Sequence, residues 1–187
     1  MNKITELPLF PLGLILFPQE KLPLHIFEPR YKEMIYNKLN YNQPFGIVLN
    51  EKNKIFNIGC IVEINKVIKV YSDNRYDIIV KGNNRFEIEE TFMKSETIIG
   101  KIKILEDKKS TNKALIDEIH DNYLKILLKN GNSNIIDKDL RKQLSFEFVQ
   151  NILLPLSIKK KLIGTNSEDE RIKIINTIFS KVNSLSK

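Results

Sequence analysis

The first hundred residues show the alternation of apolar and polar positions that is typical of β-strands. Every second residue of 58–64 is apolar, and the alternation resumes over 76–80, beyond the turn-forming segment 72–74. A period of two places these side chains on one face, so the two runs predict a long antiparallel hairpin. The Gly-Asn-Asn triplet 82–84 tolerates positive φ and predicts a second turn. Further strands are predicted over 45–49, 85–88 and 98–104.

Prolines divide the apolar stretch at the N-terminus. Residues 7–12 read Leu-Pro-Leu-Phe-Pro-Leu, and a second apolar run spans 22–27. Proline lacks an amide hydrogen and disfavours helix in the preceding residue, so both runs are predicted to be extended, with prolines at strand ends or sheet edges. Pro29 opens a segment with helical spacing, which predicts a short helix over 29–39. The predicted core of this region comprises Leu7, Leu9, Phe10, Leu16, Phe17, Leu24 and Phe27.

From about Lys108 the period of apolar positions becomes helical. A helix carrying Leu115, Ile119 and Tyr123 on one face is predicted to end near Asn130-Gly131. The last helix opens with Ser167 and Glu170, the spacing of a capping box. Two helices are predicted between them, one from Leu140 to Ile152 and one capped by Ser157 and closed by Gly164. The fold class is therefore α+β, with a β-rich lobe over 1–106 and a helical subdomain over 107–187 that are expected to pack together.

Charge and composition change this picture little. The net charge is +7 and the pI is near 9.3, but the lysines are scattered and only Lys159–Lys161 forms a tight cluster. This favours solubility over a nucleic-acid-binding arm. The single cysteine, Cys60, cannot form an internal disulfide. The N-terminal apolar run is broken by prolines, lacks the features of a signal peptide and is too short to span a bilayer, so we expect a cytoplasmic protein without a membrane partner.

The inventory of reactive residues argues against an enzyme. The seven glycines form no phosphate-binding loop, and the sequence has no Gly-x-Ser-x-Gly or His-Glu-x-x-His motif. Cys60, His25 and His120 lie in three separate elements, so no metal site is predicted. Ser145 and Ser157 have lysines nearby, but helix caps and solvated helix faces account for them. We predict no catalytic residue, no metal and no cofactor.

Several motifs together resemble one known family. Leu7–Leu12 is followed by Leu-Phe-Pro at 16–18, Leu-Pro-Leu at 22–24 and Phe-Glu-Pro-Arg-Tyr at 27–31. The segments 58–64, 80–86, 154–156, 161–163 and 170–172 continue the match in the same order. This pattern resembles the N-terminal substrate-binding domain of Lon proteases. The resemblance implies a PUA-like β pseudo-barrel followed by a small C-terminal helical bundle, here expected as a stand-alone domain without the Lon ATPase and Ser-Lys peptidase domains.

The family resemblance implies a non-catalytic module that binds unfolded or partly exposed protein segments, as an adaptor or scaffold in protein quality control. An extended segment could bind by adding a strand to a sheet edge or in a groove beside the helical lobe. The alternatives are RNA binding through a PUA-like fold and, third, residual peptidase activity. Clients and oligomeric state stay open. Arg30 and Arg85 are expected first to pair with Glu28 or with strand-end carbonyls. The candidate substrate-binding residues are Glu28, Arg30, Tyr31 and Arg85.

Overall fold

A computed structural model of the chain describes residues 5–129, 141–150 and 152–185. The chain divides into two compact units, Met1–Glu106 and Asp107–Lys187. The first unit contains six strands and the helix α1 (Pro29–Tyr41), and the second consists of helices in its described part. In the described residues, no helix has both the length and the apolar character needed to cross a membrane.

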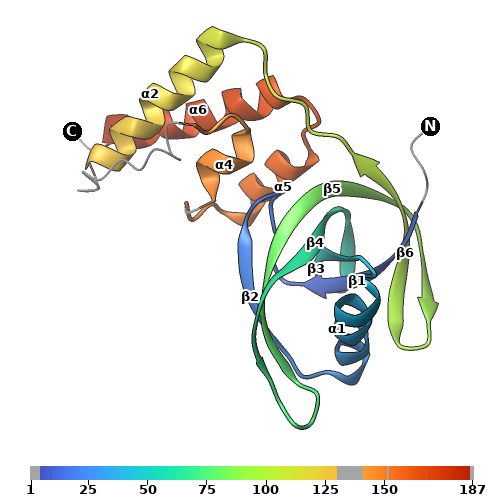
Figure 1. Ribbon diagram of the computed structural model, residues 1–187. Coiled ribbons are helices and arrows are strands. Elements are labelled where there is room, and N and C mark those ends of the chain that lie inside the picture. The colour runs from blue at the N-terminus through green and yellow to red at the C-terminus, as the bar shows by residue number, and fades with distance from the viewer. Residues whose placement is uncertain (1–4, 130–140, 151, 186–187) are drawn as a thin grey trace. The chain divides into compact units, whose positions relative to one another are not determined.

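The strands of the first unit are paired in the order β2-β5-β4-β3-β1-β6, and β6 also pairs with β5. Their bounds are β1 Thr5–Leu12, β2 Lys21–Ile26, β3 Phe45–Glu51, β4 Lys54–Val70, β5 Tyr76–Lys94 and β6 Thr97–Leu105. The second contact of β5 closes β5, β4, β3, β1 and β6 into a ring, as Figure 1 shows, while β2 is attached outside it. This mixed α+β architecture agrees with the predicted fold class.

The prediction of strand-end or sheet-edge positions holds only in part for the prolines of β1, because Pro11 is next to the end of the strand but Pro8 is within it. β1 lies between β3 and β6, and it pairs with β6 over residues 5–9 and with β3 over residues 9–12. Pro8 therefore precedes the pairing with β3, and Pro11 follows the pairing with β6. At each proline, β1 is paired with a neighbouring strand on one side only. No hydrogen bond is needed on the other side, so the missing amide hydrogen is tolerated. Pro23 lies on the outer strand β2, where the prediction is correct.

The predicted turn at 82–84 is wrong, because β5 continues through it as a strand. The register changes from Cys60 opposite Arg85 to Val62 opposite Gly82, which makes the triplet a β-bulge. Glycine is needed at 82 for close approach of the backbone: an added Cβ would lie 2.2 Å from the carbonyl oxygen of Phe17. The segment that approaches Gly82 is fixed by two main-chain hydrogen bonds of 2.9 Å, from Gln19 N to Gly82 O and from Gly82 N to Glu20 O.

The strands β2, β5 and β4 are neighbours in the sheet, and we call this part of it the β2–β5–β4 arm. The helix α1 packs on one face of this arm. Tyr31, Met34 and Ile35 are buried against apolar residues of these strands, including Ile26 and Ile78. A second cluster inside the ring comprises Leu7, Leu9, Val48, Phe86 and Ile102. Six of the seven predicted core residues are buried or half-buried, but Phe27 is exposed. The inward position at the end of β2 belongs to Ile26, and the Phe27 ring stacks on His25 instead.

The second unit contains α2 (Lys113–Lys129), α4 (Ser145–Val149), α5 (Leu156–Gly164) and α6 (Glu168–Leu185), with α2 packed along α6. The predicted helix from Leu140 to Ile152 is reduced to α4. Leu140 and Asn130-Gly131 lie outside the described residues. The Glu147 carboxylate accepts hydrogen bonds from the amides of Gln143 and Leu144, so the chain enters α4 only at Ser145. Ser157 lies within α5, which starts at Leu156, and therefore does not cap it.

A buried arginine organises the second unit. Arg171 on α6 is 0% exposed and its guanidinium bonds to the carboxylates of Glu168 (2.5 Å) and Asp107 (2.6 Å). It also donates to the carbonyl oxygen of Thr165 at 2.5 Å and to Ser145 Oγ at 3.0 Å. A buried charge without partners would be strongly unfavourable in this position, and these bonds compensate the charge of Arg171. They also connect α6 with α4 and with Asp107 at the start of the unit.

Candidate functional site

Three of the four predicted site residues lie together at the start of α1. The Arg30 guanidinium donates to Glu28 Oε2 from Nε (3.1 Å) and from Nη2 (2.8 Å). Its carbon lies 4.6 Å from the centre of the Tyr31 ring, which in turn packs at 4.1 Å on Phe10. The bond to Glu28 raises the pKa of Arg30, and the nearby Glu96 carboxylate adds to this. Burial raises the pKa of Tyr31. Arg30 pairs with Glu28 as expected.

A groove runs beside Arg30, between α1 and the end of the β5–β6 hairpin. Its main part has a volume of about 510 Å³ and includes Pro8, Arg30, Met34, Asn37, Glu96 and Ile99. A smaller hollow of about 440 Å³ shares Pro29, Arg30, Ser95 and Glu96 with it and extends to Glu28 and Met93. We call the two together the α1 groove. Its lining combines the apolar side chains of Pro8, Met34 and Ile99 with charged ones, so it suits an apolar side chain of a peptide whose polar groups meet Arg30 and Glu96.

Arg85, the fourth predicted residue, lies elsewhere. It is on β5 opposite Cys60 of β4 and Leu105 of β6, and it is 1% exposed. Tyr31 is also buried, in the core beneath α1. Glu28 and Arg30 are therefore the predicted residues that a bound molecule can reach in this unit, while Tyr31 supports the position of Arg30.

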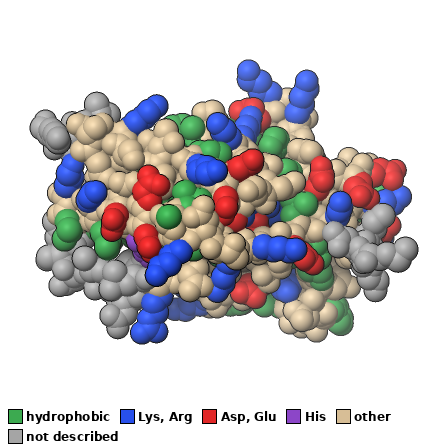
Figure 2. All heavy atoms as spheres, turned by 90° about the horizontal axis from the view of Figure 1, so that it is seen from above, with side chains coloured by type: hydrophobic (Ala, Val, Ile, Leu, Met, Phe, Trp, Pro, Cys, Tyr) green, Lys and Arg blue, Asp and Glu red, His purple; other side chains and the backbone are tan. Residues whose placement is uncertain are grey.

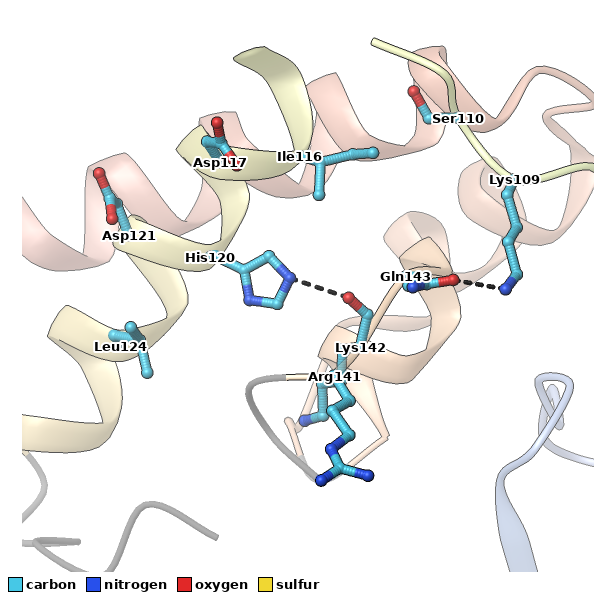
Figure 3. A pocket seen from close by; sticks show the side chains of 10 residues that line it. All are labelled: Lys109, Ser110, Ile116, Asp117, His120, Asp121, Leu124, Arg141, Lys142 and Gln143. Carbon is cyan, nitrogen blue, oxygen red and sulfur yellow. Dashed lines mark hydrogen bonds between the residues drawn. The ribbon is translucent and has the colours of Figure 1, made fainter. Parts of the chain in front are cut away.

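A further hollow of about 580 Å³ lies in the second unit, between α2 and residues 141–143 (Figure 3). His120 Nε2 lies 2.8 Å from the carbonyl oxygen of Lys142, and the His120 ring meets Phe148 edge-on at 5.0 Å. Asp117 and Asp121 flank His120 on α2, and Lys109 donates to Gln143 on the opposite wall. His120 is thus held by packing and a main-chain contact.

Comparison with known proteins identifies the family. A family model described as ATP-dependent protease La (LON) substrate-binding domain matches residues 6–181. The chain belongs to this family. A Lon protease of Cytophaga hutchinsonii is 25% identical over 187 residues, which cover 89% of this chain and 23% of that protein. The chain thus spans about a quarter of that relative, and the Lon ATPase and peptidase domains are absent from these 187 residues.

Solved structures of Lon N-terminal domains share the fold of this chain. The Lon N-terminal domain protein from Xanthomonas campestris has a TM-score of 0.75 at 19% identity, covering 93% of this chain and 98% of that one. The N-terminal domain of the Mycobacterium avium complex Lon protease has a TM-score of 0.77 at 17% identity, covering 94% and 98%. At these identities the likeness establishes the fold alone.

Ser145, one of the two serines with lysines nearby in the sequence, has a carboxylate and a guanidinium as its partners in the Lon-type domain. Ser145 Oγ donates to Glu168 Oε2 at 2.9 Å and accepts from Arg171 Nε at 3.0 Å. Ser145 is fully buried, so neither a helix cap nor a solvated face describes it, and that expectation is corrected. Across the described residues, no group of three or more His, Cys, Asp or Glu side chains could hold a metal ion.

The hairpin side of the groove is what sequence reasoning missed. Met93, Ser95 and Glu96 come from the end of the β5–β6 hairpin, about sixty residues after Arg30 in the sequence. Ser95 adopts a positive φ of 54°, which turns the chain at this end. The one local signal was Met93, an apolar residue near the end of a hairpin. Only the closure of the ring brings it to Arg30.

Proposed function

We propose that this Lon-type domain is a non-catalytic module that binds unfolded or partly exposed segments of other proteins in the α1 groove. The observation that carries the proposal is the position of Met93, whose side chain is 60% exposed and lies beside the Glu28–Arg30 pair in this groove. The family of the chain, that of a substrate-binding domain, supports the same interpretation. Methionine is flexible and polarizable, so it adapts to many apolar side chains. Such a surface suits clients of varied sequence.

In this proposal each predicted site residue has a distinct part. Arg30 and Glu28 contact the polar main chain of the client, because both are half-exposed on the rim. Tyr31 holds the Arg30 guanidinium in place from below, and Arg85 supports the strand ring rather than the client. The domain, a PUA-like pseudo-barrel followed by a helical bundle, would act in the cytoplasm as an adaptor or scaffold in protein quality control.

The test measures binding of fluorescently labelled casein, an unfolded protein, by fluorescence anisotropy. Met93→Glu places a charge in the groove and is expected to weaken binding by about tenfold. Leu128→Glu is the matched control, since Leu128 is 58% exposed and lies on α2. Equal affinity of the two variants, or no binding of casein by the unsubstituted protein, would remove the proposal.

RNA binding is the second candidate, and one cluster of residues favours it. His25, Phe27 and Tyr71 gather at the outer part of the β2–β5–β4 arm, with His25 at 5.9 Å from Phe27 and 6.0 Å from Tyr71. Lys69 and Arg75 lie at 4.4 and 4.7 Å from the Tyr71 ring. Aromatic rings beside cations are what single-stranded RNA requires.

Two observations weigh against RNA binding, one at this cluster and one on another face of the molecule. Asp77 accepts hydrogen bonds from His25 (2.6 Å) and Tyr71 (2.7 Å), so a carboxylate lies among the rings. Figure 2 shows Lys and Arg side chains interspersed with Asp and Glu on the face it presents, without a continuous basic stripe. A titration with labelled RNA tests this candidate. An affinity that falls steeply with rising salt, and that Phe27→Ala weakens, would support RNA binding; no binding at low salt would exclude it.

A further inference from the structure

The outer half of β4 has an open edge. β3 pairs with β4 only up to Val62, whereas β5 pairs with β4 as far as Val70. Among the described strands, residues 63–70 of β4 therefore have a neighbour on one side only. We call this segment the β4 edge. A row of amide and carbonyl groups on such an edge can pair with an extended chain.

Apolar side chains accompany this open edge. All six residues from 65 to 70 are exposed, and they include Val67, Ile68 and Val70, the last two at 55% and 56%. β-branched side chains favour a strand partner, and soluble proteins seldom leave several of them exposed together on an edge. The β4 edge thus combines free pairing capacity with an apolar surface.

One side of α1 extends the same surface. Lys32 Nζ donates to the carbonyl oxygen of Asp73 at 2.8 Å, in the turn beyond the β4 edge. The chain that follows α1 reaches Phe45, which pairs with Val62 at the opposite end of the edge. Tyr36 and Leu39 share the Lys32 side of the helix, and both are exposed. The helix therefore runs alongside the β4 edge, and the side of it that carries Tyr36 and Leu39 is also the side whose Lys32 reaches the turn at Asp73.

The other open edge is less suitable. β2 pairs with β5 alone among the described strands, but Pro23 lies in its middle and provides no amide donor. The β4 edge contains no proline. Register shifts leave Asn65 and Ile68 without a partner on β5, and such bulges bend a strand, so the ladder that can form here is short.

The charges of the edge select its partner. Lys66 and Lys69 lie on it, and its single acidic residue is Glu63 at the end next to Val62. A second copy of the chain paired along this edge would bring four lysines together, which is unfavourable. An extended segment with acidic residues beside its apolar ones would meet both the lysines and the exposed valines.

We propose that the β4 edge binds a client segment as an added β-strand, with alternating apolar residues and acidic flanks. This inference rests on the proposed function and names a second contact region for the same clients. Main-chain pairing supplies affinity for varied sequences, Tyr36 and Leu39 cover the apolar side chains, and Lys66 and Lys69 select acidic flanks.

The test uses a fluorescent peptide of sequence Asp-Ile-Thr-Val-Thr-Ile-Glu and two N-methylated versions, methylated on the two alternate sets of amides. Strand addition uses one set only, so one version is expected to lose more than about tenfold in affinity while the other changes by less than about twofold. Equal loss with both versions, or no binding of the parent peptide, overturns the inference.

A charge exchange gives the second readout. Lys66→Glu is expected to weaken binding of the acidic peptide by about fivefold and to strengthen binding of a version flanked by lysines. Lys54→Glu is the control: it lies on the part of β4 that pairs with β3 and should change neither affinity. Dimerisation that Ile68→Lys abolishes would mean that a second copy covers the edge, and would overturn the inference. Casein binding that depends on Met93 but not on Lys66, with equal N-methyl effects, leaves the proposed function standing alone.

Discussion

The two units of this protein differ in where most exposed apolar and most buried polar side chains lie. Among the described residues, eight of the eleven exposed large apolar side chains belong to the first unit, and four of the five buried polar or charged side chains belong to the second. In the first unit, large apolar side chains are exposed on α1, on the β4 edge and at Met93. In the second unit, charged and polar side chains are buried instead, among them Arg171, Glu168 and Ser145. Exposed apolar surface weakens solubility and is expected where a partner binds. Buried charge requires fixed partners, so it specifies a structure rather than a binding surface.

The contrast is clearest for the two arginine–glutamate pairs. Arg30 donates two hydrogen bonds to one carboxylate oxygen of Glu28, at side-chain exposures of 37% and 40%. Arg171 and Glu168 form their contact at 0% and 5%. An exposed pair contributes little to stability, whereas removal of one partner of a buried pair leaves a charge without compensation. The same chemistry thus serves structure in the second unit, and we propose that it serves recognition in the first.

Arg171→Met gives the largest expected effect. The substitution leaves the Glu168 and Asp107 carboxylates in a buried site without their cation, so the free energy of unfolding should fall by about 3–5 kcal/mol. Denaturant unfolding followed by circular dichroism measures it. Arg75→Met, which removes an exposed ion pair with Asp73, is the control and should cost less than about 1 kcal/mol. Equal costs for the two variants would break the comparison between the units.

Gly82→Ala comes next and tests the strand ring. The added Cβ would lie 2.2 Å from the Phe17 carbonyl oxygen, so the backbone must shift, at a cost of about 1–3 kcal/mol. Gly13→Ala is the matched control, because a Cβ there meets nothing within 4 Å. Thermal unfolding compares the two. A Gly82→Ala protein as stable as the control would show that residues 17–20 do not hold their place against β5.

The smallest effect concerns the exposed cluster at His25. Hydrogen bonds from His25 and Tyr71 lower the pKa of Asp77 in the folded protein. The ionised carboxylate therefore stabilises the folded state at pH values above the pKa of Asp in the unfolded chain, about 4. That contribution is lost as the pH falls through the lower folded value. His25→Ala should raise the pKa of Asp77 toward its ordinary value, measured by NMR titration of the carboxyl carbon. An unchanged pKa would show that the His25 contact does not form in solution.

Local pattern predicted the strands and the start of α1 well, because alternation and Pro29 act over a few residues. It failed where a distant segment decides. Gly82 suggested a turn, yet the approach of residues 17–20 makes it part of a bulged strand. The helix predicted over 140–152 was shortened to α4, where Glu147 binds the amides of Gln143 and Leu144.

The candidate site was predictable only in its local half. Glu28 and Arg30 are two residues apart, so their pairing followed from the sequence. Met93 and Glu96 reach them through the pairing of β6 with β1, which no local pattern encodes. Phe27 was expected in the core because it is apolar, but its position after the end of β2 leaves it outside.

The most direct measurement is the affinity of the purified protein for labelled casein, with Met93→Glu and Leu128→Glu compared at equal folding. If the first unit is the binding surface, the protein binds casein, Met93→Glu weakens binding by about tenfold, and Leu128→Glu leaves it unchanged. Absence of binding, or equal weakening by both variants, would contradict the assignment of recognition to the α1 groove.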